Sequence, residues 1–305
     1  MKRRVGISTN FLQKRFGDIE ALKIAKSVGA DAVDFSTILP HHDYRKDDSI
    51  YAKSDDEIYT YYRGLKKLAD DLGLDICQTH GRISGFKNIE SEDDALIENM
   101  RRDCIACKAL EAEYCVVHST TTIHLGPDAP KALMHSLNFD LFNRCIAEAK
   151  KYGVIIASET FGDADRYKCC DFFGNIDEFE RSYRDVSSVG DNSKYMAICM
   201  DTGHSNKAMR FNNNPTPADV IRRLGGDIKV LHLNDNDTLT DQHKIPLTGC
   251  IDWVDVFDAL DEIGYDGVYN MELNLGIIGG KGLEIESADY AVKVMRNLLK
   301  NRYGE

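Results

Sequence analysis

The stretch Lys194-Tyr-Met-Ala-Ile-Cys-Met-Asp-Thr-Gly-His204 joins a mostly apolar run to an acid and an imidazole. The apolar part is typical of a buried β-strand, and we expect a loop from Ser205 and Asn206 onwards. The same arrangement recurs where apolar runs end in a polar group, at Ile155–Glu159, Lys229–His232 and Val268–Glu272. The sequence therefore predicts four buried strands whose carboxyl ends together form one site.

The rest of the chain alternates between strand-like and helix-like segments. Strands are predicted at residues 4–8, 32–35, 74–80, 114–118, 154–159, 194–201, 229–232 and 268–272. Helices are predicted at residues 19–28, 55–72, 92–110, 130–152, 176–186, 217–224, 252–263 and 284–299. This alternation indicates parallel strands with βα connections, and eight such units fit a closed (β/α)8 barrel of the α/β class. Because no linker divides the chain, we expect residues 1–305 to form a single barrel domain.

Composition narrows the classes of partner and the compartment. The net charge of -12 at pH 7 repels phosphate backbones, so we expect no nucleic-acid partner. Most of the 9 cysteines lie in apolar patterns, which favours reduced thiols in a cytoplasmic protein. The pair Cys104-x-x-Cys107 has no second pair nearby and is expected to be buried in a helix. The apolar run after Met1-Lys-Arg-Arg4 is too short for a signal sequence, and no apolar run suggests a membrane partner.

The four strand ends carry a set of side chains that suits a metal ion. In a (β/α)8 barrel the carboxyl ends of the strands converge on one mouth, where Glu159, Asp201, His232 and Glu272 would meet. Carboxylate oxygens with one imidazole suit one divalent cation. The oxygen-rich set favours Mn²⁺ or Mg²⁺, and the histidine leaves Zn²⁺ and Co²⁺ open.

These motifs resemble those of the xylose isomerase-like TIM-barrel superfamily, in particular its sugar phosphate isomerase/epimerase group. The segments that carry the resemblance are Ser-Glu159-Thr, Met-Asp201-Thr-Gly-His204, Val-Leu-His232-Leu-Asn-Asp235, Asp241-Gln-His243-Lys-Ile-Pro-Leu-Thr-Gly249-Cys-Ile-Asp252-Trp253 and Tyr-Asn-Met-Glu272-Leu. The similarity extends over essentially the whole chain, and the motifs follow one another at the spacing of a barrel. The resemblance is specific for the superfamily and carries little information on the substrate.

The resemblance implies a sugar or keto-sugar isomerase or epimerase that moves a proton next to a carbonyl through a metal-stabilised enediolate. Glu159, Asp201, His232 and Glu272 would hold the metal, and the two glutamates would also exchange the proton. His204 would touch substrate oxygens. Asp165 stands roughly where related ketose epimerases carry a substrate-binding glutamate. Lys244 is the cation nearest to the place where those epimerases carry a substrate-binding arginine. Because the sequence has no clear match for this arginine, it departs from the pattern of a simple ketose epimerase.

Several other histidines are candidates for the site. His80 and His118 end predicted strands, so we expect both at the mouth as substrate contacts or as ligands of a second metal, with hydrogen-bonded core histidines as the alternative. His243 is expected in a loop, where it is either a site residue or a solvent-exposed side chain. The long polar loop 37–54 is predicted to form a lid or pocket wall. Structural or surface roles are expected for His41, His42, His124 and His135, and helix packing is expected for Trp253.

Other functions remain open at this stage. Metal-dependent abasic-site endonucleases of the same barrel use additional ligands, and His80, His118, Asp241 and His243 stand at comparable places. The acidic net charge argues against that function. A keto-inositol or keto-sugar dehydratase or lyase is a third possibility, which includes the metal-bound subunit of a carbon-glycoside-cleaving complex. A non-catalytic binding protein is a fourth. The family resemblance also leaves a homo-oligomer open, and no phosphate-binding motif decides whether the sugar is phosphorylated.

Overall fold

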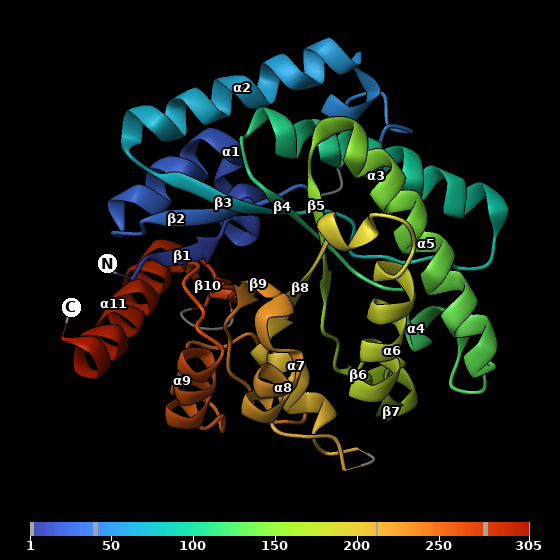
Figure 1. The fold of residues 1–305 in the computed structure, drawn as a ribbon. Helices are drawn as coiled ribbons and strands as arrows, with labels where there is room; N and C mark the ends of the chain where they lie inside the picture. Colours follow the sequence, from blue (N-terminus) through green and yellow to red (C-terminus); the bar gives the residue numbers. More distant parts are fainter. Residues whose placement is uncertain (1–2, 39–41, 212, 277–279, 305) are drawn as a thin grey trace.

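The computed structural model describes residues 3–38, 42–211, 213–276 and 280–304, and a barrel of parallel strands forms its centre (Figure 1). The barrel strands are β1 (Val5–Ser8), β2 (Ala32–Ser36), β3 (Asp75–His80), β4 (Tyr114–Val117), β5 (Ile155–Glu159), β8 (Met196–Asp201), β9 (Ile228–His232) and β10 (Tyr269–Met271). They are hydrogen-bonded in the order β10-β1-β2-β3-β4-β5-β8-β9. A parallel bridge from Leu233 to Met271 brings the two ends of this order together. The predicted (β/α)8 barrel is confirmed.

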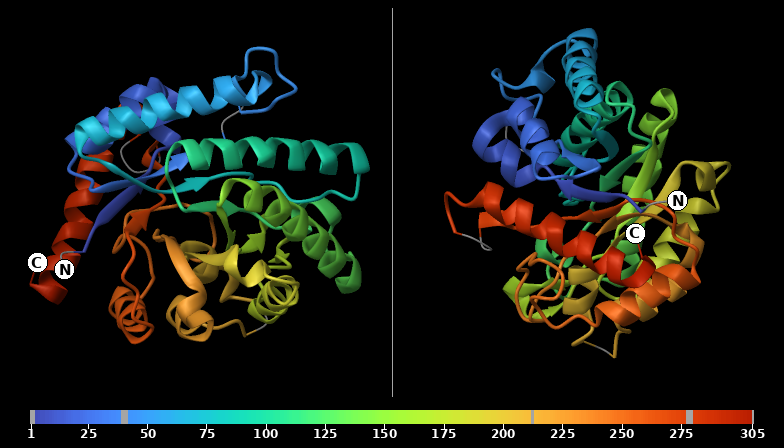
Figure 2. Two further views of the ribbon diagram at one scale, coloured as in Figure 1. Left: turned by 45° about the horizontal axis from the view of Figure 1, so that its top comes forward. Right: turned by 90° about the vertical axis from the view of Figure 1, so that its left-hand side faces the viewer.

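Helices surround the barrel, and both chain ends lie beside the last of them (Figure 2). They are α1 (Asn10–Ser27), α2 (Asp55–Leu72), α3 (Glu90–Ala109), α4 (Thr122–Leu125), α5 (Lys131–Tyr152), α6 (Ile176–Ser187), α7 (Thr202–Ala208), α8 (Pro217–Leu224), α9 (Trp253–Glu262) and α11 (Glu284–Tyr303). Local sequence sets their ends: a capping box of Ser54 and Glu57 starts α2, and Gly73 with φ 62° ends it. Within the described part of the chain, every helix is too short or too polar to cross a lipid bilayer.

Three segments differ from the prediction. The helix expected at residues 19–28 begins already at Asn10, and Gly17 with φ 80° marks a kink that interrupts its apolar periodicity. The prediction of a loop after His204 is wrong, because residues 202–208 form α7. The side chain of Asp201 accepts a hydrogen bond from the His204 backbone N–H at 2.6 Å, and this cap starts the helix. A short hairpin of β6 (Asp163–Ala164) and β7 (Cys169–Cys170) was not expected either.

An apolar layer inside the barrel determines where the polar side chains lie. This separate buried cluster consists of Val116, Ala157, Ala197, Cys199 and Val230. Side chains along a strand alternate between the two faces, so residues two positions further along point to the same side. For four strands that next residue is His118, Glu159, Asp201 or His232. The barrel therefore presents these four side chains directly above its apolar layer, at the carboxyl ends of the strands.

Candidate metal centre

Glu159 is the centre of the cluster at the mouth. Its side chain is fully buried at the end of β5, and imidazoles surround both of its oxygens. Oε1 lies 3.2 Å from Nδ1 of His232 and 3.3 Å from Nδ1 of His204. Oε2 lies 2.8 Å from Nε2 of His118 and 3.5 Å from Nε2 of His80. One carboxylate thus contacts side chains from β3, β9 and α7 and from the residue that follows β4.

Glu272 follows β10 and faces Glu159 across two imidazoles. Its Oε2 lies 3.3 Å from Nδ1 of His232, the same atom that Glu159 approaches. Its Oε1 lies 3.6 Å from Nε2 of His80, which is also the neighbour of the second Glu159 oxygen. Each glutamate therefore directs one oxygen towards His232 and the other towards His80. The rings of these two histidines are stacked, with centroids 5.2 Å apart.

Asp34 fixes the orientation of His232 from behind. Its Oδ2 lies 3.0 Å from Nε2 of His232, and both side chains are fully buried. Nε2 is thereby engaged, so Nδ1 is the ring nitrogen that faces Glu159 and Glu272. Such a carboxylate partner is the usual support of a metal-binding histidine. Burial raises the pKa of Asp34, and the negative charges around His232 raise the pKa of the imidazole despite its burial, so the pair holds a proton between them.

Asp201 contributes to the cluster from the end of β8. Besides capping α7, its carboxylate accepts a hydrogen bond from Nδ2 of Asn234 at 2.8 Å. His204, on the first turn of α7, lies 3.8 Å from the Asp201 carboxylate through Nδ1. Asp201 therefore joins Glu159 and His204 in one group of potential ligands.

A second corner of the site lies further out on the loop after β9. Asp241 Oδ2 lies 3.6 Å from Nε2 of His204 and 3.3 Å from Nε2 of His243. Burial lowers the pKa of His243, but its hydrogen bond to Asp241 and the nearby carboxylates outweigh this and raise the pKa to about 9. The three residues form another set of potential ligands, which shares His204 with the group of Glu159 and Asp201. We call His204, Asp241 and His243 the outer corner.

The inner cluster fits a metal ion by its chemistry. The side chains of His80, Glu159, His232 and Glu272 offer ligand atoms within 4.8 Å of one another. Among the described residues, neither oxygen of Glu159 has a partner with hydrogen-bond geometry, nor does Nδ1 of His232. Buried polar atoms are normally satisfied, so several bare oxygen and nitrogen atoms that converge on one point indicate a place for a cation.

Electrostatics separates the two glutamates. Burial raises the pKa of Glu272. Burial acts on Glu159 in the same direction, but the charges of His118 and His232 outweigh it and hold the pKa well below its ordinary value. Burial lowers the pKa of His80, so this imidazole is neutral at pH 7. Two neighbouring carboxyl groups with oppositely shifted pKa values are typical of sites that transfer protons.

The structure does not bring every predicted site residue into the mouth. Asp165 belongs to the 3-10 helix η2 (Asp165–Tyr167), with a side chain that is 60% exposed and ion-paired with Lys168 at 2.6 Å. Asp165 belongs to none of the groups of potential ligands. The backbone of Lys244 pairs with that of Asp235, and the role of Lys244 as a substrate contact stays a prediction. The remaining histidines lie elsewhere. His42 packs on Tyr51, His135 contacts Glu178 and His124 is exposed, while His41 lies outside the described residues.

Three polar residues of the site were missed. Asp34 could have been noticed as a lone acid inside an apolar strand pattern. Lys207 on α7 is buried, with Nζ 2.7 Å from Oδ1 of the buried Asp163. Nothing in the sequence indicated this pair, because Lys207 stands in the segment that was expected to be a loop and Asp163 is the first residue of the unexpected hairpin.

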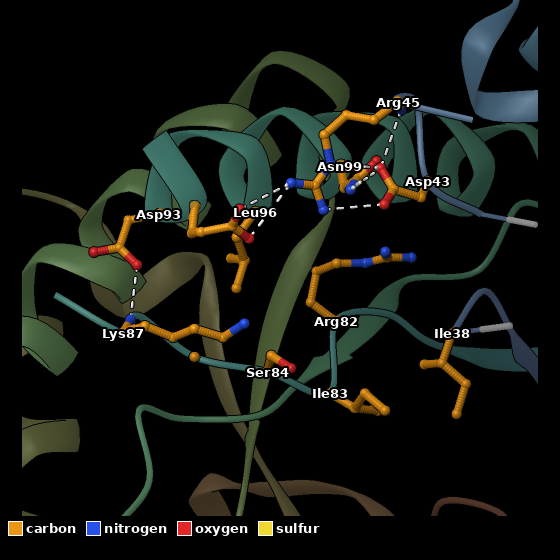
Figure 3. Close-up of a pocket in the computed structure, with 12 residues that line it drawn as sticks. Ile38, Asp43, Arg45, Arg82, Ile83, Ser84, Lys87, Asp93, Leu96 and Asn99 are labelled. Carbon is orange, nitrogen blue, oxygen red and sulfur yellow. Dashed lines mark hydrogen bonds and ion pairs between the residues drawn. The ribbon is translucent and has the colours of Figure 1, made fainter. Parts of the chain in front are cut away.

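A pocket of about 160 Å³ lies beyond the ends of β2 and β3 (Figure 3). Its lining residues are Ile38, Asp43, Arg45, Arg82, Ile83, Ser84, Gly85, Lys87, Glu92, Asp93, Leu96 and Asn99. Ile38, Asp43 and Arg45 come from the long loop after β2, in the role of pocket wall that was expected for it. Arg82 anchors this loop by donating a hydrogen bond to the backbone oxygen of His42 at 2.9 Å. The pocket thus adjoins the strand that carries His80.

Comparison of the sequence with known protein families agrees with the barrel architecture. The sequence model of the family described as "Xylose isomerase-like TIM barrel" matches residues 22–298. The chain belongs to this family, as its motifs and its barrel indicated.

Individual relatives are distant. An uncharacterized protein of Methanocaldococcus jannaschii is 28% identical over 164 residues, which are 53% of this chain and 51% of the relative. The chain thus matches about half the length of this curated relative. Two solved structures share the fold with a TM-score of 0.71 and 18% identity. One is D-psicose 3-epimerase in the presence of D-fructose (97% of this chain, 99% of that one), and the other is the IolI protein with a bound zinc atom (99% and 100%).

Proposed function

We propose that this protein is a divalent-metal-dependent isomerase or epimerase of a sugar or keto-sugar. The observation that carries the proposal is the symmetric placement of Glu159 and Glu272 about His232 and His80. One oxygen of each glutamate lies 3.2–3.3 Å from Nδ1 of His232, and the other lies 3.5–3.6 Å from Nε2 of His80. Two carboxylates that approach one point from β5 and β10 can remove and return a proton on opposite sides of a substrate carbon.

Glu159, Asp201, His232 and Glu272 would hold the metal. Asp201 forms one group of potential ligands with Glu159 and His204 and another with His243 and Glu272, while His80, the fourth member of the inner cluster, would face the substrate. Mn²⁺ or Mg²⁺ suits the carboxylates, and Zn²⁺, which the related IolI structure contains, suits the histidine. When bound, the metal would polarise the substrate carbonyl as a Lewis acid. A carboxylate that binds a metal through both oxygens is a poor base. Because each glutamate has a second oxygen on the His80 side, the proton can be carried by that oxygen.

Glu272 is suited to remove the first proton. Its side chain is 14% exposed, whereas that of Glu159 is fully buried, so Glu272 is the glutamate that a substrate in the mouth can reach. His80 and His118 would orient substrate oxygens. A substrate longer than one sugar unit would extend into the pocket beyond β2 and β3. A dehydratase or lyase would share the first proton transfer and then expel a leaving group, so it remains the alternative chemistry. The nine free cysteines suit a reducing, cytoplasmic environment.

The test is a screen of ketoses, aldoses and keto-sugars with protein that has been stripped by a chelator and reloaded with one metal at a time. The proposal expects no turnover by the stripped protein and recovery with at least one divalent ion. At a metal concentration that saturates the variant, Glu272→Gln should lose ~10²–10⁴-fold in rate, the usual effect of a lost general base, because the amide keeps an oxygen for the metal but cannot take up the proton. Turnover that is indifferent to chelation would refute the proposal.

A second candidate, an abasic-site endonuclease with several metal ions, is favoured by one observation. His80 and His118 lie 3.5 and 2.8 Å from Glu159, and Asp241 lies 3.6 Å from His204 and 3.3 Å from His243, so ligands for additional metal ions are close at hand. The net charge of -12 disfavours a DNA duplex as the substrate. Nicking of a duplex with an abasic site by the metal-loaded protein, at catalytic protein concentrations, would favour the endonuclease.

A further inference from the structure

The outer corner has the composition of a metal site, and an ammonium group lies beside it. His204, Asp241 and His243 offer ligand atoms within 4.8 Å of one another. Nζ of Lys207 lies 3.7 Å from Oδ1 of Asp241, the oxygen that does not face the two histidines. The Asp241 carboxylate is therefore placed between two imidazoles on one side and a lysine on the other.

Lys207 is held in this position by burial and by a second carboxylate. Its side chain is only 6% exposed, and Nζ lies 2.7 Å from Oδ1 of the fully buried Asp163. A buried ammonium is strongly unfavourable unless it is paired, so the lysine has no low-energy position outside this pair. It lies on α7, the helix that also carries His204.

The positive charge of Lys207 is only partly neutralised by Asp163. Asp163 also forms an ion pair with Arg210, so this single carboxylate faces two cations. Asp241 is the second carboxylate near Lys207, with Oδ1 3.7 Å from Nζ. A divalent ion in the outer corner would have to bind a carboxylate that is already partly neutralised, with Lys207 close behind it.

We propose that Lys207 takes the place of a metal ion at the outer corner, so that His204, Asp241 and His243 bind no metal under conditions that fill the inner cluster. Lys207 thereby acts as a positioning residue for Asp241. The carboxylate, held between Lys207 and the two imidazoles, is available to accept hydrogen bonds from substrate hydroxyl groups. The inference rests on the proposed function, because it assigns the outer corner to substrate rather than to additional catalytic metals.

Coulomb's law gives the scale of the effect. A unit charge about 6 Å from a divalent ion, at an effective dielectric constant near 20, is sufficient to weaken metal binding by on the order of 100-fold or more. Replacement of the ammonium by an uncharged side chain of similar length should restore that affinity. An arginine, which keeps the charge, should not.

The test is a metal titration of Lys207→Met, Lys207→Arg and the unsubstituted protein by calorimetry, with elemental analysis of the same samples. Lys207→Met is expected to bind one more equivalent of Zn²⁺, at least about 100-fold more tightly than the unsubstituted protein does, and Lys207→Arg is expected to bind none more. The added substitution His243→Ala should remove the extra equivalent. The matched control is Lys66→Met, because Lys66 is 12% exposed and pairs with Asp70 and Glu111 far along the chain from the site.

Two results would overturn the inference. The first is the same number of bound Zn²⁺ ions in Lys207→Met and in the unsubstituted protein. The second is a Zn²⁺ ion that the protein with Lys207 intact already binds and that His243→Ala removes. Circular dichroism checks the fold, and Lys207→Gln replaces Lys207→Met if the latter does not fold. Failure of the proposed function has a different signature, because the inner cluster would then bind no metal in any of these proteins. In that case the Zn²⁺ ion that depends on His243 can still be compared between Lys207→Met and Lys207→Arg.

Discussion

Asp34→Asn is expected to weaken metal binding although Asp34 itself is no metal ligand in the proposed site. The Asp34 carboxylate accepts the Nε2 proton of His232 over 3.0 Å, in surroundings where both side chains are fully buried. It thereby leaves the lone pair of Nδ1 for the metal. An asparagine removes the negative charge, and its amide can also present an N–H group to Nε2. The ring proton would then move to Nδ1, the atom that must bind the metal.

The expected magnitude follows from this geometry. Loss of the partner that orients a metal-binding histidine typically weakens metal affinity by ~10–100-fold. This corresponds to ~1.4–2.7 kcal/mol of binding free energy. We expect the upper part of this range, because both side chains are fully buried and because the change also disfavours the required tautomer.

The assay is a calorimetric titration of chelator-treated protein with Mn²⁺ and, separately, with Zn²⁺. Asp103→Asn is the matched control, because Asp103 is an equally buried carboxylate whose bonds go to Arg82 and Tyr51. The control should lower the melting temperature without a comparable change in the dissociation constant of the metal. A dissociation constant for Asp34→Asn within twofold of the unsubstituted value, in folded protein, would refute the reasoning.

Three further results are expected. Asp201→Ala should reduce the metal content measured by elemental analysis towards zero, and a full equivalent in that variant would contradict the ligand set. His80→Gln should lower kcat while the metal content stays unchanged, since Glu159, Asp201, His232 and Glu272 are retained; loss of metal would instead make His80 a ligand. Burial raises the pKa of Asp171 to about 6, above its unfolded value, so the free energy of unfolding should fall by up to about 3 kcal/mol as the pH rises from about 4 to 6. Asp171→Asn should remove this pH dependence in urea denaturation, and an unchanged slope would exclude the assignment.

Much of the fold could be predicted because one physical pattern repeats. Buried parallel strands are nearly continuous apolar runs, and their carboxyl ends share one edge, so a polar residue at the end of each run indicates the mouth. Glu159, Asp201 and His232 end strands in the structure as expected, and Glu272 follows the last residue of β10. The bounds of α2 and α8 also agree with the prediction, because a capping box and a proline mark their starts.

The residues that were missed depend on contacts between distant parts of the chain. Asp34 bonds to His232 across the barrel, a relation between side chains 198 positions apart that no local pattern encodes. α7 forms because Asp201 serves both as a predicted ligand and as a helix cap, and a single aspartate does not reveal its second role. Lys207 became visible as part of the site only with that helix, since its partners Asp163, in β6, and Asp241, in the loop after β9, lie in two other segments.

The measurement that tests the central claim most directly is the uptake of deuterium from D₂O during turnover of a substrate found in the screen. Proton transfer through a glutamate that exchanges with solvent predicts deuterium at the carbon next to the carbonyl. The Glu272→Gln variant, with its metal content measured on the same sample, should lose the label and the turnover together. Full turnover by the unsubstituted protein without deuterium in the product would contradict the account, because the hydrogen would then move directly between carbons and leave both glutamates as metal ligands only.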